Sequence, residues 1–234
     1  MRSFLLRVCV GACSLLPLQP LTAAPPVPAD APIGLLSKVI LEVLRKESGK
    51  TWENAIRGQT LSSGDMVRTG PKSLAIIKFK DNSLVRLRER SELTVTGTIT
   101  GGAFYKAVEV QTGVVGFNVQ KQRPGEEFRF TSPTSVASIR GTAGMFTAKT
   151  MSDTLMVTEG SVLYTNRVSN TSVDVLSGFT GISNQDGTIQ TRRSTESERR
   201  AALEAQQDGQ SKKLEIDLRD PQGKTNRLKI EYRD

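Results

Sequence analysis

Few residues in this chain could take part in catalysis or metal binding, and the residue types that are absent exclude several kinds of site. Histidine is absent from all 234 residues, and the two cysteines, Cys9 and Cys13, both lie close to the N-terminus. These absences exclude Ser-His-Asp and Cys-His nucleophiles, and zinc sites built on thiolate or imidazole ligands. Carboxylates remain, but the sequence contains no acidic calcium-binding loop and no evident pair of catalytic carboxylates. We therefore expect no enzyme activity, no metal and no cofactor.

Basic side chains offer the best candidate for a binding surface. They alternate with apolar residues in one stretch of the chain, at Lys78, Lys80, Arg86, Arg88 and Arg90. If the two strands that carry them pair, the five charges would share one face and could hold an anionic polymer of the cell envelope. The ordinary alternative is a solvated outer face whose charges oppose aggregation. No aromatic residues interleave with the basic ones, so we expect no nucleic-acid partner despite a net charge of +8.

A second group of charges consists of Asp65, Arg68 and Arg140. Together they could form a charged ligand-binding cluster. Alternatively, Asp65 caps its own turn and one arginine pairs with it in a partly buried position. In either case we expect Asp65 to accept hydrogen bonds from the backbone N–H of Val67 or Arg68, as in an Asx turn.

The elements that must position these side chains begin with the stretch from Trp52 to Gly70. Three glycines, Gly58, Gly64 and Gly70, recur at a spacing of six residues and predict three tight corners. One short strand, Met66–Thr69, is predicted between the last two corners. The single tryptophan, Trp52, could line a ligand groove, but its expected place is the core, beside Leu61 and Val67.

Short strands separated by turn residues continue along the chain from Leu36 to Leu176. Alternation of apolar and polar residues is clearest at Ala75–Phe79 and Val85–Arg88. More than ten such strands, with no long helical pattern between them, predict an all-β fold. Irregularly recurring apolar segments with G-x-V favour a solenoid-like stack of short strands. A β-sandwich remains the alternative.

The two ends of the chain differ from this pattern. Residues 1–24 (Met1–Ala24) are typical of a secretory signal peptide, and residues 25–35 form a proline-rich linker. Cys13 could instead be the lipidated end of a lipoprotein. After a β domain over 36–192, a capping box at Thr195 and Glu198 predicts a mostly solvated helix within 193–210. Residues 211–234 predict a β-hairpin around Asp220-Pro221-Gln222-Gly223, which would cap its own domain or add strands to a partner.

One set of motifs resembles a known family. The stretch 52–70 reads W-x5-G-x2-L-x2-G-D-x-V-R-T-G, and it is followed in order by related segments at 73–87, 113–119, 139–146 and 155–162. This pattern resembles the FecR-like domain of iron-dicitrate-type regulators from Gram-negative bacteria, over roughly residues 36–182. The positions that carry the resemblance, whose expected role is structural, are Trp52, Gly58, Leu61, Gly64, Asp65, Val67, Arg68, Thr69, Gly70, Arg140, Gly141 and Thr142.

The resemblance implies a β-helix-like architecture and an extracytoplasmic location. In the regulators that give the family its name, a cytoplasmic segment acts on a sigma factor and a membrane span leads to the outer domain. Here the residues before the apolar N-terminal segment are too few for a cytoplasmic domain. We therefore expect a periplasmic or secreted protein that binds or scaffolds another envelope protein. The alternatives are a membrane-anchored sensor in transmembrane signalling, if the N-terminal segment is retained, and a binder of anionic envelope polymer.

Overall fold

The computed structural model describes residues 32–100, 103–208, 211–219 and 225–233, with backbone alone for residues 99, 100, 103, 211–219 and 225–233. The predicted signal peptide, most of the linker, Cys13, and the predicted turn at 220–223 lie outside these residues.

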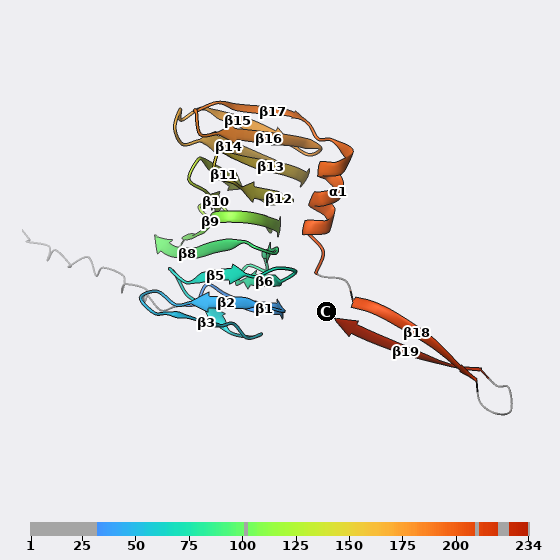
Figure 1. Ribbon diagram of the computed structural model, residues 1–234. Helices are drawn as coiled ribbons and strands as arrows, with labels where there is room; N and C mark the ends of the chain where they lie inside the picture. The colour runs from blue at the N-terminus through green and yellow to red at the C-terminus, as the bar shows by residue number, and fades with distance from the viewer. Residues whose placement is uncertain (1–31, 101–102, 209–210, 220–224, 234) are drawn as a thin grey trace, which may run out of the picture.

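Strands dominate the fold (Figure 1). Strands β1 to β17 form two facing layers, called sheet A and sheet B here, and β18 and β19 form a separate two-stranded sheet. Sheet A contains, in spatial order, β4 (Thr60–Leu61), β1 (Gly34–Ile40), β6 (Leu74–Phe79), β7 (Leu84–Leu87), the end of β9 (Ala103–Asn118), β12 (Ala143–Ala148), β13 (Ser152–Glu159), β16 (Phe179–Asn184) and β17 (Ile189–Arg193). Sheet B contains β3 (Trp52–Asn54), β2 (Val43–Lys46), β5 (Met66–Thr69), β8 (Glu92–Thr100), the start of β9, β10 (Glu127–Thr131), β11 (Ser135–Ile139), β14 (Ser161–Asn166) and β15 (Ser172–Leu176).

The long strand β9 joins the two sheets. Its first half pairs with β8 and β10 in sheet B, and its second half pairs with β7 and β12 in sheet A. Gly113 lies between the halves with φ +102°, where a Cβ would come 2.1 Å from the Ser91 Oγ. Glycine is therefore required at the point where β9 passes from one sheet to the other.

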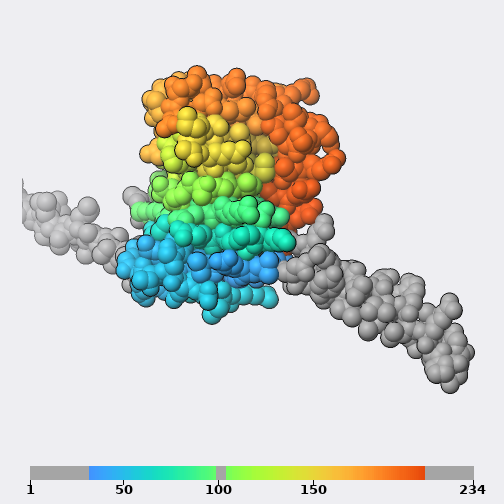
Figure 2. All heavy atoms as spheres, in the orientation of Figure 1, coloured from blue at the N-terminus to red at the C-terminus, as the bar shows by residue number. Residues whose placement is uncertain are grey.

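From β6 onward the chain is built of hairpins that fall in one sheet and then the other, which produces the layered stack of Figures 1 and 2. The prediction of an all-β stack of short strands is confirmed. Neighbouring strands pair antiparallel except for β9 and β10, because tight turns reverse the chain within each hairpin. The stack therefore differs from the parallel coils of a regular β-helix.

The core lies between the two sheets. Its apolar side chains come from inward positions of both, and a column of aromatic rings crosses several layers. Phe117 and Phe130 have ring centroids 5.0 Å apart, Phe130 and Phe146 are 6.0 Å apart, and Phe146 contacts Tyr164 edge to face at 6.5 Å. Aromatic contacts of this kind add to the stability that apolar burial supplies. They fix successive layers against one another.

Three buried polar networks lie at the edges of this core. Lys106 on β9, whose side chain is fully buried, pairs with Asp81 in the β6–β7 turn at 2.6 Å. Arg45 on β2 pairs with Asp65 at 2.8 Å. Asp153 accepts hydrogen bonds from the hydroxyls of Ser132, Thr134 and Ser135. A buried charge without such partners would be costly, so each network links strands and turns of different layers.

Helix α1 (Glu196–Ala205) packs on the outer face of sheet A (Figure 1). The predicted capping box is present: the Thr195 hydroxyl accepts the Glu198 N–H, and the Glu198 carboxylate accepts the Thr195 N–H. Ala202 and Ala205 are buried, whereas Leu203 is 58% exposed. The helix is mostly solvated, as expected, but its buried face packs on sheet A. Its small residues fit closely against a strand that sequence reasoning did not connect with it.

The predicted C-terminal hairpin is present as β18 (Ser211–Arg219) and β19 (Thr225–Arg233). The two strands pair antiparallel with Leu214 opposite Ile230.

Candidate functional site

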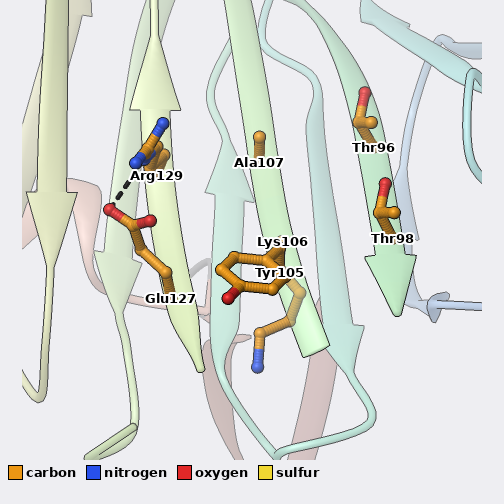
Figure 3. A pocket seen from close by; sticks show the side chains of 7 residues that line it. All are labelled: Thr96, Thr98, Tyr105, Lys106, Ala107, Glu127 and Arg129. Atoms are coloured by element: carbon orange, nitrogen blue, oxygen red, sulfur yellow. Dashed lines mark ion pairs between the residues drawn. The ribbon is translucent and has the colours of Figure 1, made fainter. Parts of the chain in front are cut away.

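The outer face of sheet B is the candidate site because α1 contacts strands of sheet A and leaves this face open. Strands β8, β9 and β10 carry a shallow hollow of about 340 Å³. Figure 3 shows the side chains that line it, which are Thr96, Thr98, Tyr105, Lys106, Ala107, Glu127 and Arg129. Most of them come from alternate positions of neighbouring strands, and they meet because the register places Tyr105 between Thr98 and Glu127.

Tyr105 and an ion pair give this hollow its character. The tyrosine is 42% exposed. Beside it, Arg129 Nε lies 2.7 Å from Glu127 Oε1, and the hydrogen bond to this carboxylate raises the pKa of Arg129. Glu127 also accepts the Ser138 hydroxyl at 3.0 Å. An aromatic ring next to an arginine held in place by its partner is typical of the anchor residues of protein–protein interfaces.

Lys106 borders the hollow, but its ammonium group does not point into it. The Nζ atom turns to Asp81, at 2.6 Å, and lies 4.9 Å from the centre of the Phe104 ring. Burial disfavours the charged form of Asp81, but hydrogen bonds from Lys106 and Gln122 outweigh it and lower the pKa of this carboxyl. The charge of Lys106 is therefore committed to the fold.

A second hollow of similar volume adjoins the first and shares Tyr105 and Glu127 with it. It extends to Ser138 and Arg140 across β11. Arg140, one of the predicted charge-cluster residues, is exposed here. The two hollows lie on either side of Tyr105 and together form a furrow. An extended segment or a loop of a partner could bind in this furrow.

Apolar side chains flank this furrow towards both ends of the stack. At one end Trp52 on β3 is half-buried, with the Arg68 guanidinium 4.3 Å from its ring centre. The expectation that Trp52 fills the core is wrong, because its position on β3 faces outward, opposite Lys46. At the other end Leu163 and Leu176 are about half exposed, at 49% and 53%.

The predicted partners of Asp65 are corrected by the structure. Asp65 pairs with Arg45, whereas Arg68 pairs with Glu92 at 2.6 Å. Asp65 also accepts the backbone N–H of Ser62 at 3.0 Å, not that of Val67 or Arg68. The carboxylate therefore caps the turn before it. The sequence signal for the Arg45–Asp65 contact is the alternation on β2, because it places Arg45 on the inward side, between two strand neighbours.

The remaining motif positions lie at turns or in buried parts of the strands. Gly58 and Gly64 have positive φ, as predicted for corners, but Gly70 does not; a Cβ there would come 2.3 Å from Glu42 Oε2. Leu61, Val67 and Thr69 are buried. Gly141 has φ +75° beside Lys121, and the buried Thr142 donates its hydroxyl proton to the Ser161 carbonyl at 3.0 Å.

The five basic residues predicted as one surface are divided. Lys78, Lys80 and Arg90 are exposed, whereas Arg86 is buried and bound to Asp208. Arg88 donates to the carbonyl of Gln207, at 3.2 Å. The C-terminal end of α1 therefore occupies part of the expected anion-binding face. The paired residues lie about 120 positions apart in the sequence, so sequence analysis could not predict this contact.

Among the described residues, no helix combines the length and apolar character that a membrane span needs. In the same part of the chain, no three carboxylate, imidazole or thiol groups gather where they could hold a metal ion.

Comparison with known proteins agrees with the motif reading. Residues 65–163 match the family model described as FecR protein, which confirms the resemblance. Two crystal structures, each of a candidate anti-sigma factor from Parabacteroides distasonis ATCC 8503, share the fold with TM-scores of 0.50 and 17% identity. The match covers 59% of this chain and 64% and 63% of theirs, less than two thirds of their length. No curated protein sequence matches the chain.

Proposed function

From the FecR domain of residues 65–163, we propose that this chain is an exported, non-enzymatic module of the bacterial cell envelope that binds a protein partner. The partner contacts the outer face of sheet B. The observation that carries the proposal is the furrow around Tyr105 on a sheet face that α1 leaves open.

The chemistry of this face fits a protein better than a small molecule. Its hollows are shallow, they are lined by threonine, tyrosine and an Arg–Glu pair, and half-exposed leucines lie further along the same sheet. Small-molecule sites are usually concave and mostly apolar. Interfaces combine aromatic and arginine anchors with a polar rim.

Export rests on the sequence of residues 1–24, whose basic start and short apolar core are typical of a cleaved signal peptide. Cleavage near Ala24 would place the sheet B face in the periplasm or outside the cell. A second candidate, a membrane-anchored sensor, is favoured by the likeness to anti-sigma factor folds and requires an intact N-terminal segment. The mass of the protein isolated from its native envelope separates the two.

A photo-crosslinking experiment tests the binding face. A benzoyl-phenylalanine residue replaces Tyr105 or Leu163 in the full chain expressed in its native host, and Met151, which is 66% exposed in the turn between β12 and β13, serves as the control position. We expect one adduct of the same mass from the two sheet B positions. We expect it to be absent from the Met151 variant and lost when Arg129→Glu reverses the charge beside the furrow.

Two outcomes of this experiment would contradict the proposed binding face. If Tyr105 and Leu163 give no adduct while Met151 does, the partner binds elsewhere. If all three positions give the same set of adducts, the labelling reports crowding and not a specific face.

A further inference from the structure

Three cations of sheet A converge on the end of α1. Arg86 Nε lies 2.6 Å from Asp208 Oδ1, Arg88 donates to the Gln207 carbonyl, and Lys38 donates to the Asp208 carbonyl. They come from β1, from β7 and from the residue after β7. The segment that follows the helix is thus bound both through a carboxylate and through backbone carbonyls, the groups that carry negative charge at a helix C-terminus.

The receptor half of this contact is built into the body of the protein. The Arg86 side chain is only 7% exposed, whereas that of Asp208 is 60% exposed. Arg86 is oriented by a second hydrogen bond, from Nη1 to Asn118 Oδ1 at 2.7 Å. Arg88 lies close by, and burial lowers the pKa of its guanidinium. The charge of Glu204 opposes this lowering, and the charge of Arg86 adds to it.

The two ends of α1 are held in different ways. At the N-terminal end the capping box, a bidentate Arg192–Glu198 pair and a Ser194–Thr180 hydroxyl contact anchor the helix to β16 and β17. Towards the C-terminal end only Ala202 and Ala205 are buried. An isolated helix of ten residues is marginal in water. Docking of the last turn must therefore depend strongly on the contacts of Gln206, Gln207 and Asp208.

We propose that Arg86 is a carboxylate-binding site, that Asp208 is its ligand in the free chain, and that occupancy of this site, supported by the bonds of Lys38 and Arg88 to backbone carbonyls, keeps the last turn of α1 docked. The consequence reaches the C-terminal hairpin. Only residues 209 and 210 separate Asp208 from Ser211, so β18 must begin within about 10 Å of this site while it is occupied. An acidic side chain of another protein that took the site would free both the helix end and the hairpin. This inference does not depend on the sheet B face.

Hydrogen exchange in the full chain tests the site. The variant Asp208→Asn keeps the shape of the ligand and removes its charge, and Asp174→Asn, an exposed position on β15 in the other sheet, is the matched control. We expect amides of α1 from Ala202 to Gln206 to exchange about 5- to 30-fold faster in Asp208→Asn, with no change in the control. Asp208→Glu should stay near the wild-type rate because it retains a carboxylate.

Salt provides a second test. In 1 M NaCl α1 of the wild type should exchange faster than at low salt but more slowly than in Asp208→Asn, because the Asp208 carboxylate is exposed while Arg86 is buried and less screened. Equal exchange in wild type and Asp208→Asn would overturn the proposal. So would acceleration that spreads equally to the strands.

Discussion

Gly116 on β9 lies directly beneath the end of α1: a Cβ built on it would come 2.1 Å from the carbonyl oxygen of Ala205. This close approach explains why a helix with little apolar surface can pack on a sheet. Small residues on both sides, Gly116 below and Ala202 and Ala205 above, let the two backbones meet. It also places Gln206 to Asp208 within reach of Arg86 and Lys38.

Replacing Gly116 should therefore displace α1. We expect Gly116→Ala to lower the free energy of unfolding by about 1–3 kcal/mol, since the clash is with backbone and has no side chain to yield. Urea denaturation measures the change. In a chain that ends at Arg193, which has no α1, the same substitution should cost far less. An equal loss in both chains would mean that the strand itself cannot accept the methyl group.

The Arg45–Asp65 pair should outweigh the neighbouring surface pair. Both side chains are nearly buried, at 8% and 3% exposure, so Arg45→Ala leaves an unpaired buried carboxylate and should cost about 3–5 kcal/mol. Arg68→Ala breaks an exposed pair with Glu92 and should cost no more than about 1 kcal/mol. Denaturant midpoints of the two variants make the comparison. If Arg68→Ala cost more stability than Arg45→Ala, Arg68 would be the more important of the two arginines.

Acid should loosen the start of α1 over a defined range. The hydrogen bond to Arg192 lowers the pKa of Glu198 to about 2, against a burial effect in the opposite direction. Because the folded pKa lies below the unfolded value of 4.5, the contribution of Glu198 is complete above pH 4.5 and is lost as the pH falls towards 2. The protection of the first turn of α1 against hydrogen exchange, corrected for the pH dependence of intrinsic exchange, should fall across that window. In Glu198→Gln this protection should show no Glu198-dependent fall over the same pH range.

The fluorescence of the single tryptophan should report a surface residue. With Trp52 half-buried beneath Arg68, acrylamide should quench its emission in the native state, which a core tryptophan would resist. Arg68→Ala should expose the ring further and shift the emission to longer wavelength. Leu163→Ala, at the far end of sheet B, should leave the spectrum unchanged. A blue, unquenched emission would mean that Trp52 is in the core after all.

The sequence by itself determined the features that depend on local chemistry. Alternation of apolar and polar residues predicted the strands, including Met66–Thr69 with the boundaries that β5 shows. The capping box at Thr195 and Glu198 predicted the helix start, because its hydrogen bonds join residues three apart. The motifs from Trp52 to Val162 predicted a resemblance to the FecR family, whose model matches residues 65–163.

Only the tertiary structure decided which charges meet. Asp65 binds Arg45 because β2 and β5 are neighbours in sheet B, and Arg86 binds Asp208 because α1 returns across β9 towards β7. The furrow around Tyr105 likewise depends on the register of β8, β9 and β10. Alternation states which side of a strand a residue occupies. It does not state which strand lies beside it, since that choice is made by the packing of the whole stack.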